Sequence, residues 1–380
     1  MVPTATRCCG LHRTAVSVPP MATLSTSRKL TFSLVTCLGI VLLAELALRL
    51  TGLPAGTFRM VEPGTAGLWP PNFNEVLTLG PVPYRVVANA DGFRGPPLLP
   101  QGEALRVVCI GDSMTEGFYV DNPYTYPAWM QRTLDDRGLN VEVINAGRGG
   151  GSIDRFIGIF EQAVRPLKPD LIVVSWVNND PWEVGRSGFQ PATSTSSDSL
   201  VRFLLVHSAL GEGLMRMALH RHEHYQGAAT ADGDQRYRID GWDDTAANSA
   251  HFLSRFKGAR LLLVDDHNEE MQAKMKAYAT ELERFFSLAT AAGIPVLYLV
   301  IPSYPEVHIN APRTYLETTL PVAERWNVPV LDVLPQLRAA EGPITLAPVD
   351  YHLNPAGNRV LGEAVAERVM ALVGTAKTTE

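Results

Sequence analysis

The sequence of 380 residues contains only four cysteines, and their positions exclude a disulfide-stabilised fold. Cys8 and Cys9 lie near the N-terminus, Cys37 lies inside an apolar run, and Cys109 lies in a stretch with the pattern of a core strand. This distribution does not offer the regular pairing that small disulfide-rich domains use. A core of apolar side chains must therefore hold the fold together, and hydrophobic residues make up 46% of the chain.

An excess of positive charge is also missing. The chain has 33 Lys and Arg residues against 39 Asp and Glu residues, a net charge of −6, and no long block of like charge. A nucleic-acid-binding protein needs a basic face to neutralise phosphates, so we expect no nucleic-acid partner. Spacing typical of metal ligands is rare too: His220 and His224 would share a helix face, but no second ligand pair accompanies them. We expect neither a metal nor another cofactor.

Long hydrophobic runs are limited to residues 30–50, which are long enough to cross a hydrocarbon core of about 30 Å as a helix. Residues 1–29 include basic residues and no acidic one, so the positive-inside rule predicts a cytoplasmic tail and an extracytoplasmic remainder of the chain. Glu45 and Arg49 would share a helix face, and Arg49 lies near enough to the end to snorkel. We expect a single-pass membrane anchor; a cleaved signal peptide is the alternative, although no clean cleavage site follows.

The rest of the chain divides by its pattern. Residues 51–104 are rich in proline and glycine and predict a linker that packs on the following domain. From residue 105 to 373 apolar strands and helices alternate, which predicts a three-layer α/β/α sandwich with a mostly parallel sheet of about five strands. Residues 374–380 are a tail. Residues 181–267 interrupt the alternation, and as an insertion after the third strand they are a candidate lid. The expected strands are residues 105–110, 141–145, 171–176, 295–301 and 329–333.

Polar residues stand where these apolar runs end. The first predicted strand stops at Gly111-Asp112-Ser113, which places Ser113 at the carboxyl edge of the sheet, where α/β proteins bind ligands. A serine hydroxyl there needs a base within hydrogen-bond reach to act as a nucleophile. Three further polar blocks follow in order: residues 145–152, residues 178–180 and residues 350–357.

Together the four blocks resemble those of the SGNH hydrolases, also called GDSL esterases and lipases, over roughly residues 104 to 373. The resemblance implies a flavodoxin-like fold and ester chemistry without a cofactor. It also implies Ser113 as nucleophile, His352 as base and Asp350 as the acid that orients it. The expected oxyanion donors are the backbone N–H groups of Ser113 and Gly150 and the side-chain amide of Asn179.

Several of these assignments leave alternatives open. Asp350 and His352 are separated only by Tyr351, whereas the family usually has two residues between them. The alternatives are Gly149 or Gly151 for the glycine donor, Asn178 for the amide, His308 for the base and Asp332 for the acid.

Three other charged residues lie close to these blocks. We expect Asp112 to fix the turn that holds Ser113 by accepting backbone N–H groups. Glu116 and Arg148 are near enough in sequence to touch a substrate, and we slightly prefer to interpret them as surface charges.

The function expected from the resemblance is hydrolysis of carboxylic esters through an acyl-enzyme, as in an esterase, lipase or acyl hydrolase. The same residues would serve an O-acetyl esterase or O-acyltransferase that acts on a cell-envelope glycan. An alternative of another class is a catalytically silent module that binds a glycan or lipid in the same cleft. The sequence names neither the acyl chain nor the acceptor.

Overall fold

The computed structural model describes residues 25–51, 65–77, 82–185, 208–211, 245–264, 268–348 and 350–376. The chain divides into two units, residues 1–52 and residues 53–380, and each is described by itself. Most of the predicted insertion, including His220 and His224, lies outside the described residues.

The first unit contains the helix α1 (Thr26–Thr51), which includes the predicted hydrophobic run. None of its residues is buried, and Leu34, Leu42 and Leu50 are each at least 60% exposed. Arg49 and Glu45 form the expected pair one helical turn apart, with 2.6 Å between Nε and Oε1. By length and composition α1 can cross a membrane, a test that a signal sequence near the N-terminus also passes.

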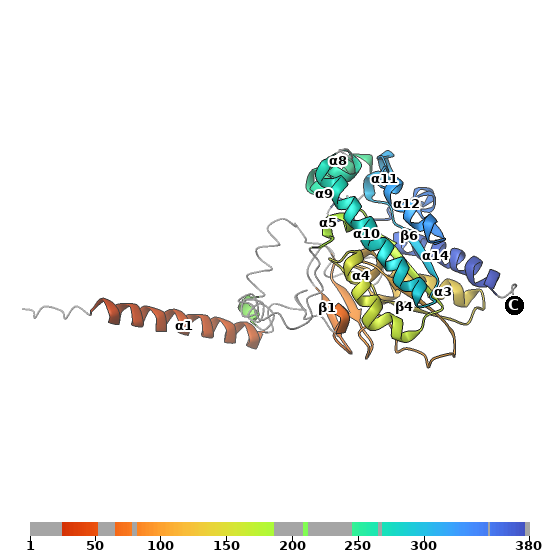
Figure 1. The fold of residues 1–380 in the computed structure, drawn as a ribbon. Coiled ribbons are helices and arrows are strands. Elements are labelled where there is room, and N and C mark those ends of the chain that lie inside the picture. Colours follow the sequence, from red (N-terminus) through yellow and green to blue (C-terminus); the bar gives the residue numbers. More distant parts are fainter. Residues whose placement is uncertain are drawn as a thin grey trace, which may run out of the picture. The chain divides into compact units, whose positions relative to one another are not determined.

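The second unit is built on a parallel sheet of five strands, which confirms the predicted α/β class (Figure 1). Its strands are β3 (Leu105–Ile110), β4 (Val141–Asn145), β5 (Leu171–Trp176), β6 (Val296–Val300) and β7 (Val330–Asp332). The spatial order β4-β3-β5-β6-β7 places the first strand of the sheet second from the edge, which is the doubly wound, flavodoxin-like order. In this order the chain changes direction across the sheet between β3 and β5, and ligand sites form at that point.

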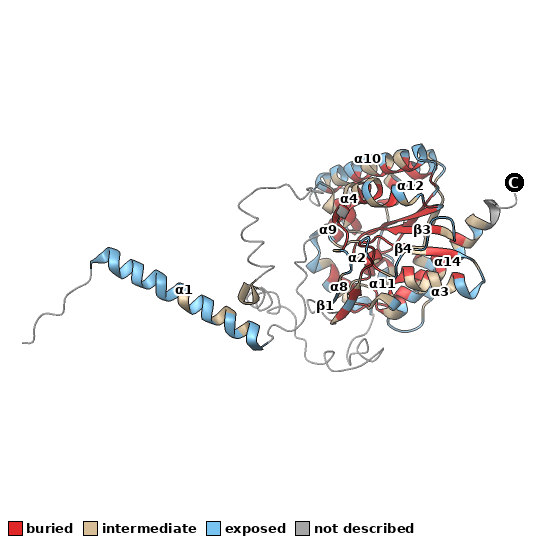
Figure 2. Ribbon diagram, turned by 90° about the horizontal axis from the view of Figure 1, so that it is seen from below, coloured by how far each residue is buried: buried red, intermediate tan, exposed pale blue. Residues whose placement is uncertain are grey.

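Helices cover both faces of the sheet because successive strand residues point to opposite sides. Val108 and Ile110 of β3 belong to one apolar cluster, and Val107 and Cys109 belong to the other, so this strand is covered on both faces (Figure 2). The first face packs against α4 (Ile153–Ile159), α10 (Glu269–Ala291) and α12 (Leu316–Arg325). The second packs against α3 (Tyr126–Asp136), α13 (Leu334–Ala339) and α14 (Pro355–Ala376).

Shorter elements lie around the sheet. The 3₁₀ helix η2 (Asn122–Tyr124) precedes α3, and the π-helical turn η3 (Phe160–Val164) and the 3₁₀ turn η4 (Arg165–Leu167) follow α4. The helices α8 (Ala246–Arg255) and α9 (Lys257–Leu263) precede α10, and α11 (Tyr304–Ile309) follows β6. Two four-residue helices, α2 (Ser113–Glu116) and α5 (Asp180–Glu183), begin just after β3 and β5.

The proline-rich stretch upstream of the sheet has more structure than its composition indicates. After the short turn η1 (Thr65–Gly67), it forms an antiparallel pair of strands, β1 (Asn74–Leu77) and β2 (Tyr84–Val87). Trp69, Leu77 and Tyr84 are buried in a small cluster of their own. Each strand has only four residues and stands between prolines and glycines, which is why the sequence did not predict them.

Arg94 joins this upstream stretch to the loop that follows α2. The side chain is almost fully buried, and Nη1 donates to the carbonyl oxygens of Glu116 at 2.6 Å and Gly117 at 2.7 Å. Nη2 donates to the carbonyl oxygen of Val120 at 2.5 Å. One cation therefore binds three carbonyl groups at the end of α2 and in the loop that follows it.

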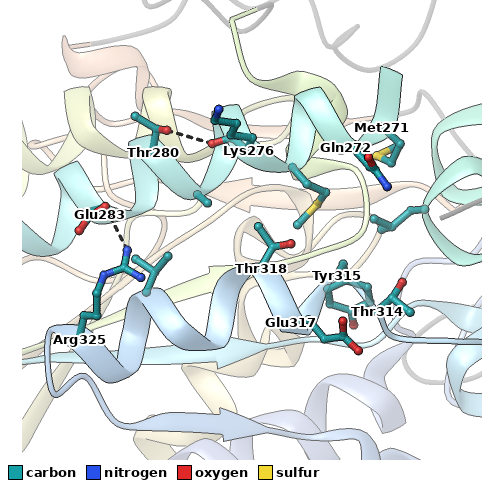
Figure 3. Close-up of a pocket in the computed structure, with 14 residues that line it drawn as sticks. Met271, Gln272, Lys276, Thr280, Glu283, Thr314, Tyr315, Glu317, Thr318 and Arg325 are labelled. Carbon is teal, nitrogen blue, oxygen red and sulfur yellow. Dashed lines mark hydrogen bonds and ion pairs between the residues drawn. The ribbon is translucent and has the colours of Figure 1, made fainter. Parts of the chain in front are cut away.

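A groove of about 640 Å³ lies between α10 and α12 (Figure 3). Met271, Lys276 and Thr280 line its α10 side, and an ion pair of 3.1 Å between Glu283 and Arg325 lies at one end. None of the residues that line it belongs to the four polar blocks.

Candidate active site

Ser113 is the first residue of α2, directly beyond the carboxyl end of β3. Asp112 caps this helix, because its Oδ1 accepts the backbone N–H of Met114 at 2.9 Å. At Gly111 a Cβ atom would lie only 2.0 Å from the Ser175 hydroxyl oxygen, so only glycine allows the strand to turn this tightly. Asp112 fixes the serine turn as expected from the sequence.

His352 reaches Ser113 from the far end of the chain. Its Nε2 lies 2.8 Å from the Ser113 Oγ, within hydrogen-bond distance. The rings of Phe118 and Tyr119 lie 5.1 and 5.4 Å from the imidazole, centroid to centroid. The alternative base, His308, instead packs in a tilted arrangement on Tyr304, with 4.2 Å between the ring centroids.

Asp350 contacts His352 despite the short spacing between them. Its Oδ1 lies 2.5 Å from the ring Nδ1 and also accepts the backbone N–H of His352 at 2.9 Å. Tyr351 faces the other way, where its hydroxyl lies 2.6 Å from Nδ1 of His251 and donates to the carbonyl oxygen of Asn248 at 3.2 Å. One Asp350 oxygen accepts both the ring N–H and the backbone N–H of His352. The two side chains therefore meet although only Tyr351 separates them in the sequence.

The electrostatics of Asp350 follow from this contact. Burial alone would raise its pKa, but the charge and hydrogen bonds of His352 hold the pKa of Asp350 below its ordinary value. The alternative acid, Asp332, is paired with Arg313, whose Nη2 donates to Asp332 Oδ1 at 3.1 Å. The structure thus places Asp350 and not Asp332 on the histidine.

Asn179 lies on the opposite side of the serine turn, just before α5. Its Nδ2 donates to Asp112 Oδ2 at 3.4 Å, and the same oxygen lies 3.2 Å from Ser113 Oγ. Among the described residues, Asn178 makes no side-chain hydrogen bond. Burial raises the pKa of Asp112, although hydrogen bonds from Met114 and Asn179 oppose this rise.

The glycine-rich block packs directly against the serine turn. The N–H of Arg148 donates to the carbonyl oxygen of Gly111 at 2.8 Å. A Cβ atom at Gly147 would lie 2.2 Å from the Glu116 backbone nitrogen, so this approach requires glycine. Gly149 donates its N–H to Glu116 Oε2 at 2.5 Å, which removes it as a free oxyanion donor, whereas Gly150 is exposed and has a φ of 71°.

The interpretation of Glu116 and Arg148 as surface charges is wrong. The Glu116 side chain is fully buried, and Arg148 is 12% exposed with its Nη1 3.4 Å from Glu116 Oε2. The guanidinium of Arg148 also lies over the Trp69 ring at 3.9 Å. The physical reason is the glycine loop: without side chains it lies directly over α2 and excludes water from Glu116.

Asp180 is a buried acid that sequence reasoning did not single out. Its Oδ2 accepts the N–H of Val177 at 3.1 Å, while Oδ1 has no hydrogen-bond partner in the described part of the chain. Burial, together with the charge of Asp112, raises the pKa of Asp180 well above its ordinary value. The only sequence signal was its place at the end of an apolar strand.

The described ranges contain no group of three or more His, Cys, Asp or Glu side chains that could hold a metal ion. The Ser113 hydroxyl, the His352 imidazole and the Asp350 carboxylate form a hydrogen-bonded array. The Asn179 amide and backbone N–H groups complete the site. Such an array can move a proton from a hydroxyl to an imidazole and can stabilise a negative oxygen.

Residues 109–360 match the GDSL-like Lipase/Acylhydrolase family. An arylesterase of Vibrio mimicus is 25% identical over 112 residues, which cover 30% of this chain and 54% of the relative, so the match spans about half of that protein. A crystal structure of an acetyl xylan esterase, AlAXEase, is 16% identical and covers 70% of this chain and 99% of its own, with a TM-score of 0.40. A crystal structure of a lipase/acylhydrolase from Enterococcus faecalis is 16% identical and covers 70% of this chain and 95% of its own, with a TM-score of 0.39.

The family match covers about two thirds of the chain and includes all four polar blocks up to residue 360. The flavodoxin-like strand order and the position of Ser113 at the change of direction agree with it. The chain belongs to the GDSL-like lipase/acylhydrolase family, the SGNH hydrolases that its four blocks resemble.

Proposed function

We propose that the protein hydrolyses carboxylic esters by a Ser-His-Asp mechanism with an acyl-enzyme intermediate. The observation that carries this proposal is the array from Ser113 Oγ through His352, 2.8 Å to Nε2, to Asp350, 2.5 Å from Nδ1. His352 takes the proton as Ser113 attacks the acyl carbonyl and returns it to the leaving alcohol. Asp350 keeps the proton of the neutral ring on Nδ1 and stabilises the imidazolium that forms.

Three groups would stabilise the oxyanion. Ser113 is the first residue of α2, so its N–H has no partner within the helix. Gly150 follows a glycine whose own N–H is engaged by Glu116, and Asn179 carries an amide on the other side of the turn. Preorganised donors of this kind are each worth about 2.7–4 kcal/mol of transition-state stabilisation.

The proposal includes a membrane location. The helix α1 is apolar and has no buried residue, and burial of its side chains in a bilayer would remove this apolar surface from water, which supports the proposal. The basic flank of residues 1–29 supports a cytoplasmic N-terminus and an extracytoplasmic catalytic domain.

Labelling with a fluorophosphonate probe tests the mechanism, because the probe reacts with an activated serine. We expect the full-length protein to be labelled and the Ser113→Ala variant to be neither labelled nor active. Ser254→Ala is the matched control, since Ser254 lies on the surface of α8 and should leave labelling unchanged. An unlabelled wild-type protein would indicate the silent binding module, and labelling of Ser113→Ala would reject Ser113 as the nucleophile.

A panel of esters with increasing acyl length then defines the substrate class. Preference for acetyl esters would separate an acetyl esterase from a lipase, and product analysis with an added alcohol would separate transfer from hydrolysis.

A further inference from the structure

The peptide unit between Gly149 and Gly150 is held by charged side chains. It contains the carbonyl oxygen of Gly149 and the N–H of Gly150, which is the donor assigned above. What fixes this unit decides where that N–H points. The inference therefore rests on the proposed function and concerns its oxyanion hole.

Arg155 binds this peptide unit from the first turn of α4. Its Nη1 donates to the Gly149 carbonyl oxygen at 3.2 Å, and its Nη2 donates to the carbonyl oxygen of Gly67 at 2.9 Å. The guanidinium thus bridges the glycine loop and the upstream stretch that contains η1. Because both Nη atoms of Arg155 donate to carbonyl groups, its planar guanidinium has little freedom to rotate.

The orientation of the N–H follows from the planarity of the peptide. In a trans peptide the C=O and the next N–H point in opposite directions. A guanidinium on the Gly149 carbonyl therefore directs the Gly150 N–H to the side away from Arg155. That loop runs along the serine turn, because Arg148 N–H donates to the Gly111 carbonyl oxygen at 2.8 Å.

The preceding peptide is held as well. Glu116 Oε2 accepts the Gly149 N–H, and a Cβ atom at Gly149 would lie 2.1 Å from the Phe118 ring, so that ring covers the glycine closely. Gly150 has a φ of 71°, in the region that favours glycine. Because glycine has no side chain, Gly150 makes no side-chain contact that could fix its own backbone. Its orientation depends on the contacts of its neighbours.

We propose that Arg155 is a positioning residue of the oxyanion hole, which aims the Gly150 N–H by holding the Gly149 carbonyl. The same contact strengthens the N–H as a donor, because a charged donor on the carbonyl polarises the peptide. Burial, with a smaller contribution from the charge of Arg148, lowers the pKa of Arg155 to about 10. The side chain therefore stays a cation near neutral pH.

The test is steady-state kinetics of Arg155→Gln and Arg155→Lys in the full-length protein, with an ester that the wild type turns over. We expect Arg155→Gln to lower kcat by about 10- to 10²-fold with little change in KM, less than the 10²–10³-fold loss that removal of a donor causes. Arg155→Lys keeps the charge but can reach only one carbonyl, so kcat should recover in part. The labelling rate with the fluorophosphonate should fall in parallel, because its adduct also places an oxygen in the oxyanion hole.

Arg106→Gln is the matched control. Arg106 is likewise an arginine that binds a carbonyl group, with Nη2 2.7 Å from the Leu99 oxygen and Nε 2.6 Å from the Glu142 carboxylate, but it lies at the start of β3, away from Ser113. Its loss should lower the melting temperature and leave kcat of the folded protein unchanged.

The outcomes separate the two proposals. If the wild type is not labelled by the probe, the proposed function fails. If the wild type is labelled and folded Arg155→Gln retains its kcat, or loses activity through KM alone, the role of Arg155 is refuted. If Arg155→Gln does not fold, Arg155→Lys decides the matter: a lowered kcat with little change in KM supports the inference, and a wild-type kcat overturns it.

Discussion

Replacing Asp350 by Asn changes the charge at the site but not the shape of the side chain. In the structure Oδ1 accepts both the backbone N–H and the ring Nδ1 of His352. If the new NH₂ group took that position, it would face the backbone N–H, donor against donor. The amide oxygen should therefore stay there, and the histidine should keep its Nδ1 proton and its orientation towards Ser113.

The expected loss then reflects the missing charge alone. Two unit charges about 4 Å apart attract each other by about 4 kcal/mol at an effective dielectric constant of about 20, and this attraction exists only once the imidazolium forms. At about 1.4 kcal/mol per tenfold, its loss corresponds to about 10³ in kcat, and the dipole of the remaining amide oxygen offsets part of it. We expect kcat of Asp350→Asn to fall by about 10²–10³-fold with little change in KM.

Steady-state kinetics of three variants on one chromogenic ester measure this effect. Asp350→Ala removes the acceptor as well as the charge, and its loss should approach the roughly 10⁴-fold that accompanies a wrongly held histidine. Asp332→Asn is the control, because Asp332 pairs with Arg313 and should leave kcat unchanged. Equal losses in Asp350→Asn and Asp350→Ala would refute the argument about the shared oxygen. A loss below about 10-fold in both would show that another group holds His352.

Three further predictions follow from other parts of the structure. Asn179→Ala should fold normally and lose about 10²–10³ in kcat, and an unchanged rate would reassign the donor. Asp180→Asn should change how the free energy of unfolding depends on pH. Because burial raises the folded-state pKa of Asp180, the native protein keeps a proton that the unfolded chain releases above about pH 4, so stability falls with rising pH by up to about 1.4 kcal/mol per unit until the folded pKa is passed. Urea unfolding between pH 4 and 7 should show a steeper fall in the wild type than in the variant, which keeps only the contribution of Asp112, and parallel profiles would contradict it. Removal of residues 1–50 should give a soluble protein with wild-type kcat, and an inactive or insoluble product would show that α1 has a further role; recovery of the full-length protein from the medium would indicate a cleaved signal.

The sequence predicted those features that depend on the order of residues along one strand and its following turn. Four or more apolar residues in succession identify a strand covered on both faces, and the polar residues that end each run lie at one edge of the sheet. Ser113 and Asn179 follow β3 and β5, as the strand pattern predicted, whereas Asp350 and His352 directly follow no strand in the described part of the chain and were expected only from the resemblance. The contact between Asp350 and His352 needed only a turn that the two residues themselves stabilise.

Features that depend on contacts between distant loops could not be predicted. Glu116, Arg148 and Arg155 look like ordinary surface charges in the sequence, because nothing local shows that a glycine loop will cover α2. Likewise, nothing in the sequence showed that Asp180 would be buried, or that one of its carboxylate oxygens would have no hydrogen-bond partner in the described part of the chain. The strands β1 and β2 were missed because each has only four residues within a stretch rich in proline and glycine.

The contacts of Arg94 determine where this hydrolase can be shortened. The family match begins at Cys109, inside β3, yet the carbonyl groups of Gly117 and Val120 accept hydrogen bonds from an arginine upstream of that point. A buried acceptor left without a donor costs about 1–3 kcal/mol, so a fragment that starts near residue 104 would lose a large part of the stability of a typical domain. An expression fragment should keep the whole stretch from residue 65 onward, because the loop after α2 and the side chain of Arg155 both bind residues that a family alignment would leave out.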